Sequence, residues 1–182
     1  MKFLDIYNQD KNILKNILKD FKQNITKGDF ILGKPVNDFE KKFASFCGAK
    51  YAIGCGNGTD ALVISLKLLN ISKNDEVILP VNSFIATAGS IIACGAKPVF
   101  CDIDETLNID YKKIEDCVTE KTKAIMPVHL TGRMSDMDQI IKLSKKYNIP
   151  IIEDAAQAIG SKYKKKPAGS FGKVGCFSAH PL

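Results

Sequence analysis

The stretch EVILPVNSFIATAGSIIACGAKPVFCDI, residues 76–103, contains a strand pattern, a helix pattern and a second strand pattern in direct succession. The segments EVILP (76–80) and KPVFCD (97–102) are short apolar runs of the length that buried strands have. The residues between them, about 84–94, are expected to form a helix. Strands that are apolar on both faces and alternate with helices are typical of a largely parallel sheet in an α/β fold.

The same alternation continues on both sides of this unit. Further strands are expected at YAIGC (51–55), KAIMPV (123–128) and IPIIED (149–154), further helices at about 58–70 and 136–147, and a shorter helix near Asp110. After Ile159 the pattern predicts two short strands with Gly/Pro turns. Because ligands bind such sheets at the carboxyl ends of the strands, the residues that follow each strand are the candidates for chemistry.

The N-terminal part of the chain has a helical pattern instead. Apolar residues at helical spacing predict an amphipathic helix over Gln9–Lys22. A second helix is expected to begin near Pro35 and to run to Cys47, where Gly48 ends it. We therefore expect a helical segment, residues 1–48, that packs on a large domain formed by residues 49–182.

The overall composition is that of a globular protein. Of the 182 residues, 45% are hydrophobic and 25% are charged, which is enough for one hydrophobic core. No apolar run reaches the roughly 18 residues that span a bilayer. The N-terminus, MKFLDIYNQDKN, lacks the apolar region of a signal peptide. We expect a cytoplasmic protein that has no membrane partner.

The charged residues, cysteines and histidines indicate neither a nucleic-acid site nor a metal site. The net charge is +6, but the lysines are scattered, apart from the run Lys164–Lys166, which we interpret as a solvated turn. The six cysteines form no CxxC pair, and His129 and His180 lie far apart in the sequence. Neither a zinc nor an iron–sulfur site is therefore expected, and the cysteines are interpreted as reduced, mostly buried thiols.

The loop GCGNGTD (54–60) follows an expected strand and opens an expected helix. Its glycines allow close approach of the backbone to an anion, and the amides of the first helical turn, together with the Thr59 hydroxyl, can hold a phosphate. A dinucleotide-binding loop would need Gly at position 59, and a Walker loop would need a following Gly-Lys-Ser/Thr. The alternatives are a single-phosphate site and a plain strand-to-helix turn.

The segment IIEDAAQ (151–157) ends a buried strand on a carboxylate, Asp154. A buried carboxylate is costly unless it meets a cation or good hydrogen-bond donors. A protonated pyridine nitrogen is such a cation, and a carboxylate that holds this proton keeps the ring an electron sink. A helix-capping Asp is the other interpretation, and the motif alone leaves both open.

Two further strand ends carry candidate ligand contacts. In PVNSFIAT (80–87), Phe84 is either a core residue or a ring that lies flat on an aromatic cofactor. In GCFSAHPL (175–182), Ser178 is a candidate donor to the same phosphate as Thr59. His180 has no nucleophile or carboxylate beside it in the sequence and is interpreted as an ordinary loop histidine.

Four blocks of sequence, in this order, carry a resemblance to a known family. They are ILGKPVNDFEKKFASFCGAKYAIGCGNGTDAL (31–62), NDEVILPVNSFIATAGSIIACGAKPVFCDID (74–104), TKAIMPVHLTGRMSDMDQI (122–140) and IIEDAAQAIGSKYKKKPAGSFGKVGCFSAHP (151–181). The chain resembles the DegT/DnrJ/EryC1/StrS sugar aminotransferases, which are fold-type I enzymes that use pyridoxal 5'-phosphate (PLP). The resemblance implies an aspartate-aminotransferase-like large domain, the N-terminal part of a longer chain whose C-terminal small domain is absent here.

The resemblance also implies roles for individual residues. Asp154 pairs with the ring nitrogen and Gln157 contacts the phenolic oxygen, and these two are the expected catalytic residues within the chain. The remaining expected cofactor contacts are the phosphate cup, Gly58, Thr59, Asp60 and Ser178, and the stacking ring, Phe84. The family's Schiff-base lysine is expected directly after Leu182. The chain departs from the family at Thr131, where Tyr is usual, and at Ala179, where Phe is usual.

The implied activity is transfer of an amino group from glutamate to a nucleotide-linked keto sugar. The Ser-Ala-His-Pro sequence favours a dTDP-linked 3-keto-6-deoxy sugar in deoxyamino-sugar and polysaccharide biosynthesis, and the resemblance implies a homodimer with shared active sites. A dehydratase of the same family would have His in place of the expected lysine, whereas Gln157 favours transamination. A non-catalytic nucleotide-binding α/β module is the alternative from another class, and it would be colourless when purified.

Overall fold

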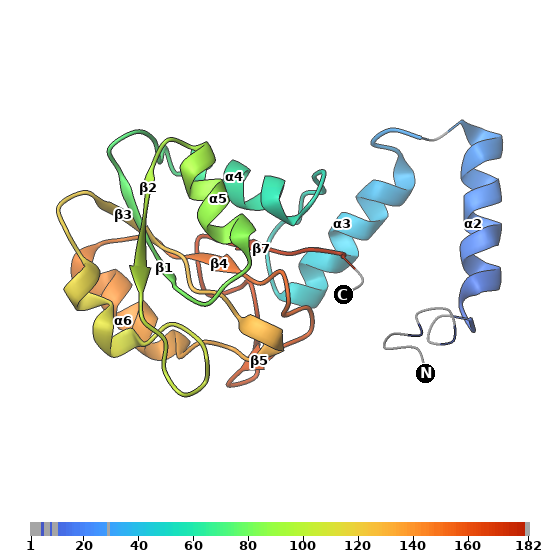
Figure 1. The fold of residues 1–182 in the computed structure, drawn as a ribbon. Coiled ribbons are helices and arrows are strands. Elements are labelled where there is room, and N and C mark those ends of the chain that lie inside the picture. Colours follow the sequence, from blue (N-terminus) through green and yellow to red (C-terminus); the bar gives the residue numbers. More distant parts are fainter. Residues whose placement is uncertain (1–4, 6–7, 9–10, 29, 181–182) are drawn as a thin grey trace.

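The structure is a computed structural model that describes residues 5, 8, 11–28 and 30–180. Figure 1 shows an α/β body with helix α3 (Lys34–Cys47) at one side of it and helix α2 (Leu14–Lys27) beyond α3. Helix α2 has no buried residue, whereas α3 buries Ala44 and Cys47 against the body. Within the described residues, no helix has both the length and the apolar character that crossing a bilayer requires.

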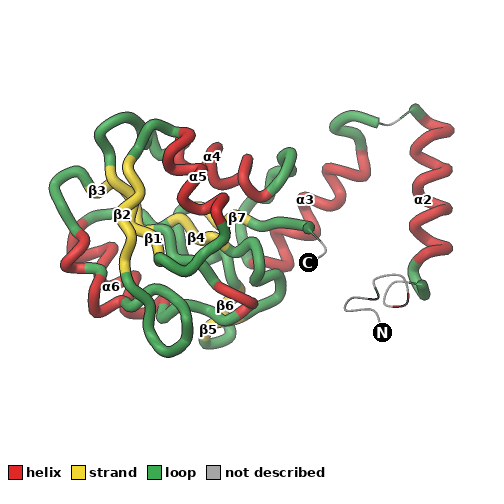
Figure 2. The backbone as a smooth tube through the Cα atoms, in the orientation of Figure 1, coloured by secondary structure: helices red, strands yellow, loops and turns green. Residues whose placement is uncertain are grey.

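The body is built on parallel strands (Figure 2). Strand β1 (Glu76–Pro80) lies between β2 (Lys97–Cys101) and β3 (Thr122–Ile125) and is parallel to both. Strand β4 (Ile152–Asp154) pairs in parallel with β7 (Val174–Cys176), and the parallel bridges Ile125–Ile151 and Val128–Asp154 connect this pair to the β3 side. All these strands therefore end at the same edge, and the expected largely parallel α/β fold is confirmed.

Helices cover both faces of this sheet. Successive residues of β1 point to opposite faces, and each face packs against different helices. Val77 and Leu79 pack with Leu66 of α4 (Gly58–Leu68) and Ile91 of α5 (Ile85–Ala93). Ile78, between them in sequence, packs in a second core cluster with Met137 and Ile140 of α6 (Met137–Tyr147). Burial on both faces explains why the strand sequences are continuously apolar.

Most expected elements are present, with shifted ends. Gly48 ends α3 in the left-handed conformation, as expected. Helix α2 ends at Lys27 instead of Lys22, and residues 9 and 10 of the expected helix lie outside the described residues. The remaining short helices are η1 (Tyr111–Lys113), η2 (Glu115–Cys117) and η3 (Leu130–Gly132).

The prediction of a strand at YAIGC (51–55) is wrong. This segment connects α3 to α4 without strand structure, and Tyr51 and Ile53 are 71% and 84% exposed. An apolar run becomes a strand only where a neighbouring strand takes up its backbone hydrogen bonds. In the structure, the Gly54 amide donates instead to the Glu40 carboxylate of α3, at 2.7 Å.

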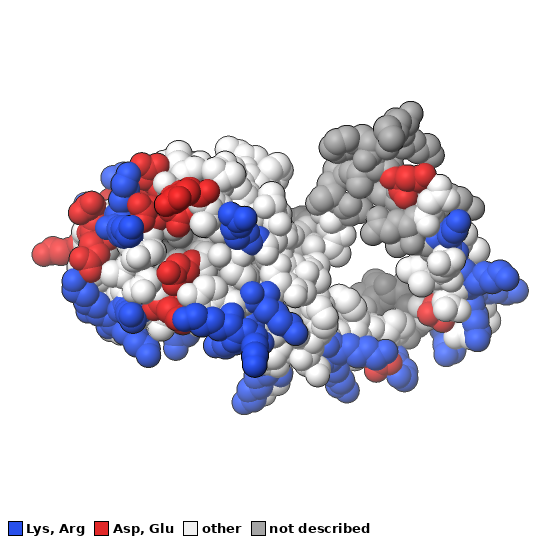
Figure 3. Space-filling view, turned by 90° about the horizontal axis from the view of Figure 1, so that it is seen from below, with Lys and Arg blue, Asp and Glu red and all other residues white. Residues whose placement is uncertain are grey.

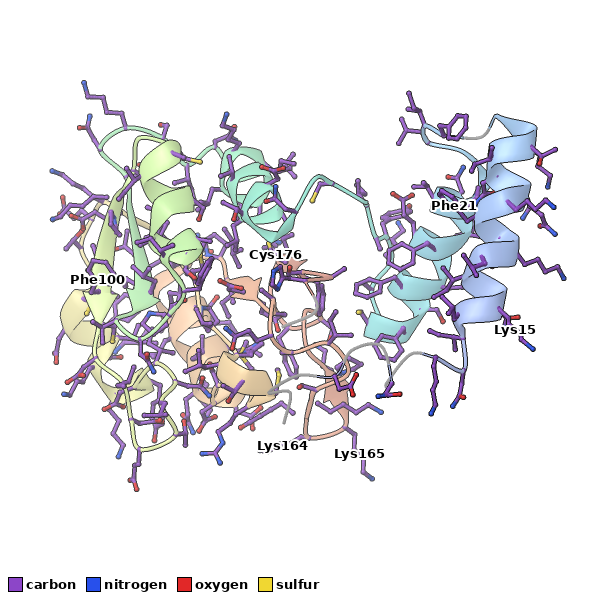
Figure 4. All side chains as sticks on the ribbon, turned by 45° about the vertical axis from the view of Figure 1, so that its right-hand side comes forward. Lys15, Phe21, Phe100, Lys164, Lys165 and Cys176 are labelled. Atoms are coloured by element: carbon purple, nitrogen blue, oxygen red, sulfur yellow. The ribbon has the colours of Figure 1, made fainter. Side chains whose placement is uncertain are left out.

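The region after Ile159 forms a hairpin and one strand of the sheet. The hairpin strands are β5 (Lys162–Tyr163) and β6 (Lys166–Pro167). With β7, this region contains three strands, whereas the sequence pattern predicted two. Lys164 and Lys165 form the hairpin turn and project outward, whereas Cys176 of β7 lies inside the body (Figure 4). Lysines are spread over both the body and the N-terminal helices on the face shown in Figure 3.

Candidate functional site

The strand ends bring the candidate residues to one edge of the sheet. Asp154 is the last residue of β4, and Ser178 follows β7. Phe84 is the N-cap of α5, which follows β1, and Gly58 is the first residue of α4. The N-terminus of α4 lies at the same edge, because Gly58 is next to Ser178, two residues beyond the end of β7.

Gly58 and Ser178 are in direct contact. A Cβ atom added at Gly58 would lie 3.1 Å from the Ser178 Cβ and 3.5 Å from its Oγ, so only glycine fits without displacing the serine. The first amides of a helix have no intrahelical acceptor, which leaves the Gly58 and Thr59 amides to face this space. Ser178 Oγ accepts a hydrogen bond from the His180 amide, so its own hydroxyl proton is available to an anion.

Asp60 forms hydrogen bonds within its own loop, both to the Asn57 side chain. Its amide donates to the Asn57 side chain at 2.9 Å, and its carboxylate accepts from the Asn57 amide group at 3.0 Å. A carboxylate can only accept hydrogen bonds when ionised, and so it cannot donate to a phosphate. Asp60 and Asn57 therefore shape the loop, and Gly58, Thr59 and Ser178 remain as candidate donors to an anion.

Asp154 is a buried acid, 4% exposed, with hydrogen bonds to both carboxylate oxygens. Thr87 Oγ1 donates to Oδ2 at 2.8 Å, and the Ala156 amide donates to Oδ1 at 3.2 Å. Burial raises the pKa of Asp154 above its usual value, and the Thr87 and Ala156 hydrogen bonds and the nearby His129 oppose this only in part. Within the described residues, Asp154 forms no ion pair with a lysine or arginine.

Phe84 and Gln157 lie at the exposed side of this edge. Phe84 is 68% exposed, which disagrees with the interpretation of a core phenylalanine and leaves its ring open to a ligand. Gln157 Oε1 accepts a hydrogen bond from the Thr131 amide at 2.8 Å. This contact fixes the side-chain amide, since its acceptor is used and its NH₂ group remains as a donor.

Two further residues, Thr87 and Glu153, were missed in the sequence analysis. Glu153 is fully buried beside Asp154 and accepts from His129 Nε2 and from the amides of Gly169, Phe171 and Gly172. It thereby holds the turn that precedes β7, the strand that leads to Ser178. The adjacent acids in IIED were the available signal, because neighbouring strand residues face opposite sides and each must find its own partners.

Together, these residues can hold an aromatic anion that carries a positive charge on its ring. The cradle offers donors to an anion, the exposed Phe84 offers a flat surface, and the buried Asp154 carboxylate offers acceptors to a cation. Among the described residues, no cluster of His, Cys, Asp or Glu is suited to a metal ion. The neighbouring Cys176 stays a thiol, because burial raises its pKa to about 12.

Comparison with known proteins gives a consistent family. The family model for DegT/DnrJ/EryC1/StrS aminotransferases matches residues 11–182. A pleiotropic regulatory protein of Geobacillus stearothermophilus is 46% identical, over 98% of this chain and 48% of its own length. A dTDP-3-amino-3,6-dideoxy-α-D-galactopyranose transaminase of Aneurinibacillus thermoaerophilus is 47% identical, over 97% of this chain and 49% of its own length. The chain thus spans about half the length of these curated relatives.

Solved structures agree with this match. A DegT/DnrJ/EryC1/StrS aminotransferase from Brucella abortus has a TM-score of 0.96 at 34% identity, over 100% of this chain and 51% of its own. A Bacillus subtilis protein solved with bound cofactor PMP has a TM-score of 0.82 at 38% identity, over 87% of this chain and 37% of its own. The expected fold, the large domain of this type of aminotransferase, is therefore confirmed.

Proposed function

The chain belongs to the DegT/DnrJ/EryC1/StrS aminotransferase family, and on this basis we propose that the full-length protein is a PLP-dependent aminotransferase acting on a nucleotide-linked keto sugar. The observation that carries the proposal is the environment of the Asp154 carboxylate. This buried carboxylate has no lysine or arginine ion-pair partner within the described residues, and the protonated nitrogen of a pyridine ring is a cation that fits it.

The phosphate end of the cofactor fits the other half of the site. The Gly58–Ser178 contact and the helix N-terminus beside it support binding of a single phosphate group, since amide and hydroxyl donors converge there. We propose that the Gly58 and Thr59 amides, the Thr59 hydroxyl and Ser178 bind this phosphate. Asp60 contributes by holding the loop through Asn57.

PLP, when bound, supplies an electron sink next to the carbon atoms between which the amino group moves. Asp154 would hold a proton on the ring nitrogen, and the exposed ring of Phe84 would support the heterocycle. The Thr131 amide holds Gln157 Oε1, and the NH₂ group of Gln157 would then donate to the phenolic oxygen. The lysine expected directly after Leu182 would serve as the proton-transfer group of the full-length protein.

The substrate is proposed in more detail from the family and from one relative. Glutamate is the proposed amino donor, and a dTDP-linked keto-6-deoxy sugar aminated at C3 is the proposed acceptor. The Ser-Ala-His-Pro sequence at 178–181 and the name of the Aneurinibacillus relative support this acceptor. A cytoplasmic homodimer that shares its active sites is part of the same proposal.

The test uses the purified full-length protein. Addition of PLP should give a visible absorbance band that glutamate bleaches, with one equivalent of 2-oxoglutarate formed, and a dTDP-linked 3-keto-6-deoxy sugar should then restore the band. A colourless protein that does not bind PLP would refute the cofactor assignment. Dehydration of the sugar without amino transfer, together with His after Leu182, would establish the dehydratase instead.

A further inference from the structure

A chain of two hydroxyl groups reaches the Asp154 carboxylate from helix α5. Thr87 is buried, and its Oγ1 lies 2.8 Å from Asp154 Oδ2. Ser83, at the half-buried end of the chain, forms a short hydrogen bond with the same Thr87 Oγ1. The hydroxyl groups thus run from the loop after β1 to the acid at the end of β4.

The direction of these hydrogen bonds follows from counting protons. An ionised carboxylate only accepts, so the single hydroxyl proton of Thr87 goes to Asp154. Ser83 must then donate to Thr87. Hydrogen bonds in such a chain polarise one another, and both donors favour negative charge on Asp154.

This use of Thr87 differs from that of the other buried hydroxyl groups in neighbouring helices. Ser90 Oγ donates to the Thr87 carbonyl within α5, and Ser65 Oγ donates to the Ala61 carbonyl within α4, with Cys176 Sγ as a second neighbour at 3.2 Å. Such local bonding is the ordinary behaviour of helical serine and threonine. Thr87 donates across the fold instead, to a residue on another element.

Thr87 also fixes the remaining freedom of Asp154. The Asp154 backbone is held on the β3 side, since its amide donates to the Pro127 carbonyl and its carbonyl accepts from the His129 amide. Its side chain then has two anchors, the Ala156 amide on Oδ1 and the Thr87 hydroxyl on Oδ2. Thr87 therefore sets where the free lone pairs of the carboxylate point.

The same helical turn carries Phe84. The Thr87 amide donates to the Phe84 carbonyl at 3.1 Å, and residues at this spacing lie on one side of a helix. The first turn of α5 therefore presents the proposed stacking ring and the anchor of the acid as one rigid unit. A flat cofactor between them would have its ring plane and its nitrogen contact set by a single element.

We propose that Thr87, backed by Ser83, is a positioning residue for the proposed aminotransferase, because its hydroxyl orients the Asp154 carboxylate and favours its charged form. The inference rests on the proposed function. The other titratable groups near Asp154 are His129 and Cys176, with Glu153 next to it in the chain. Burial raises the pKa of Asp154 and the Thr87 hydrogen bond lowers it, so loss of the hydroxyl should raise it further.

The experiment compares variants of the full-length protein. Thr87→Val removes the hydroxyl at nearly constant volume, Thr87→Ser keeps it, and Ser90→Ala removes a buried hydroxyl one turn further along α5. The readouts are the Kd for PLP, the pH profile of kcat/KM, and thermal unfolding without cofactor. Thr87→Val should weaken PLP binding about tenfold to a hundredfold, the range for a lost hydrogen bond to a charged group, and shift the acid limb of the profile to higher pH.

Thr87→Ser and Ser90→Ala should stay within about threefold of wild type in PLP affinity and keep its pH profile. A Thr87→Val protein that melts earlier but binds PLP and responds to pH like wild type would overturn the inference. If Thr87→Val does not fold, Ser83→Ala provides the test. Loss of the Ser83 donor should move the acid limb of the kcat/KM pH profile to higher pH as well. An unchanged profile for Ser83→Ala would refute the proposal. Failure of the wild type to bind PLP would refute the proposed function itself.

Discussion

Glu153 and Asp154 are adjacent residues of β4 whose buried carboxylates are satisfied in different ways. Glu153 accepts four hydrogen bonds, from His129 and from the amides of Gly169, Phe171 and Gly172. Among the described residues, Asp154 accepts two, from Thr87 and Ala156, which leaves lone pairs without a donor there. An acid with all its lone pairs used holds a structure together, whereas an acid with free lone pairs in a buried place has capacity for a ligand.

Asp154→Asn is expected to abolish transamination by the full-length protein while stabilising its cofactor-free form at pH 7. The pKa of Asp154 is raised in the folded protein. Ionisation of Asp154 therefore lowers the free energy of unfolding, by the full amount at pH values above the folded-state pKa and not at all below the ordinary value of 3.8. The stability gain over wild type should therefore vanish as the pH falls through this window. Urea unfolding at several pH values measures it, and a variant less stable than wild type at pH 7 would contradict the account.

Glu153→Gln is expected to destabilise the protein by about 3 kcal/mol, because an NH₂ group would then face N–H donors in a buried site. Hydrogen exchange should increase at Gly169, Phe171 and Gly172, whose amides bind Glu153. Glu120→Gln, on the exposed surface, is the matched control and should change stability by less than about 0.5 kcal/mol. Equal stability of the two variants would remove the assigned structural role.

Gly58→Ala is expected to weaken PLP binding roughly severalfold, because the new Cβ would lie 3.1 Å from that of Ser178 and push the serine away by a small shift. Gly89→Ala on α5 is the control. Nothing lies within 4 Å of a Cβ at that position, so the variant should gain roughly 0.5–1 kcal/mol of helix stability and keep its PLP affinity. Fluorescence titration with PLP measures both, and unchanged binding by Gly58→Ala would argue against the cradle.

Thr131→Gly is expected to preserve PLP affinity and to change stability only slightly or favourably. Thr131 has a φ of 51°, a left-handed conformation that costs about 1–2 kcal/mol for a residue with a side chain, and its contact to Gln157 uses the backbone amide. Denaturant unfolding and PLP titration provide the readouts. A large loss of affinity would show that the threonine side chain itself contacts the ligand.

The sequence predicted the fold class and the positions of Gly58, Asp154 and Ser178, because strand ends and glycine loops have local signatures. Three features could not be read from it. The segment 51–55 is apolar but lacks a strand partner, since Glu40 takes up the Gly54 amide. Thr87 and Glu153 gain their roles from contacts with residues far away in the chain. Such pairings arise from tertiary packing, which no local pattern encodes.

The most direct test of the central claim is a crystal structure of the full-length protein with PLP. The account predicts the pyridine nitrogen within hydrogen-bond distance of Asp154, the phosphate on the Gly58 and Thr59 amides and on Ser178, and the ring against Phe84. A phosphate bound elsewhere, or a ring nitrogen that faces any group other than Asp154, would contradict it.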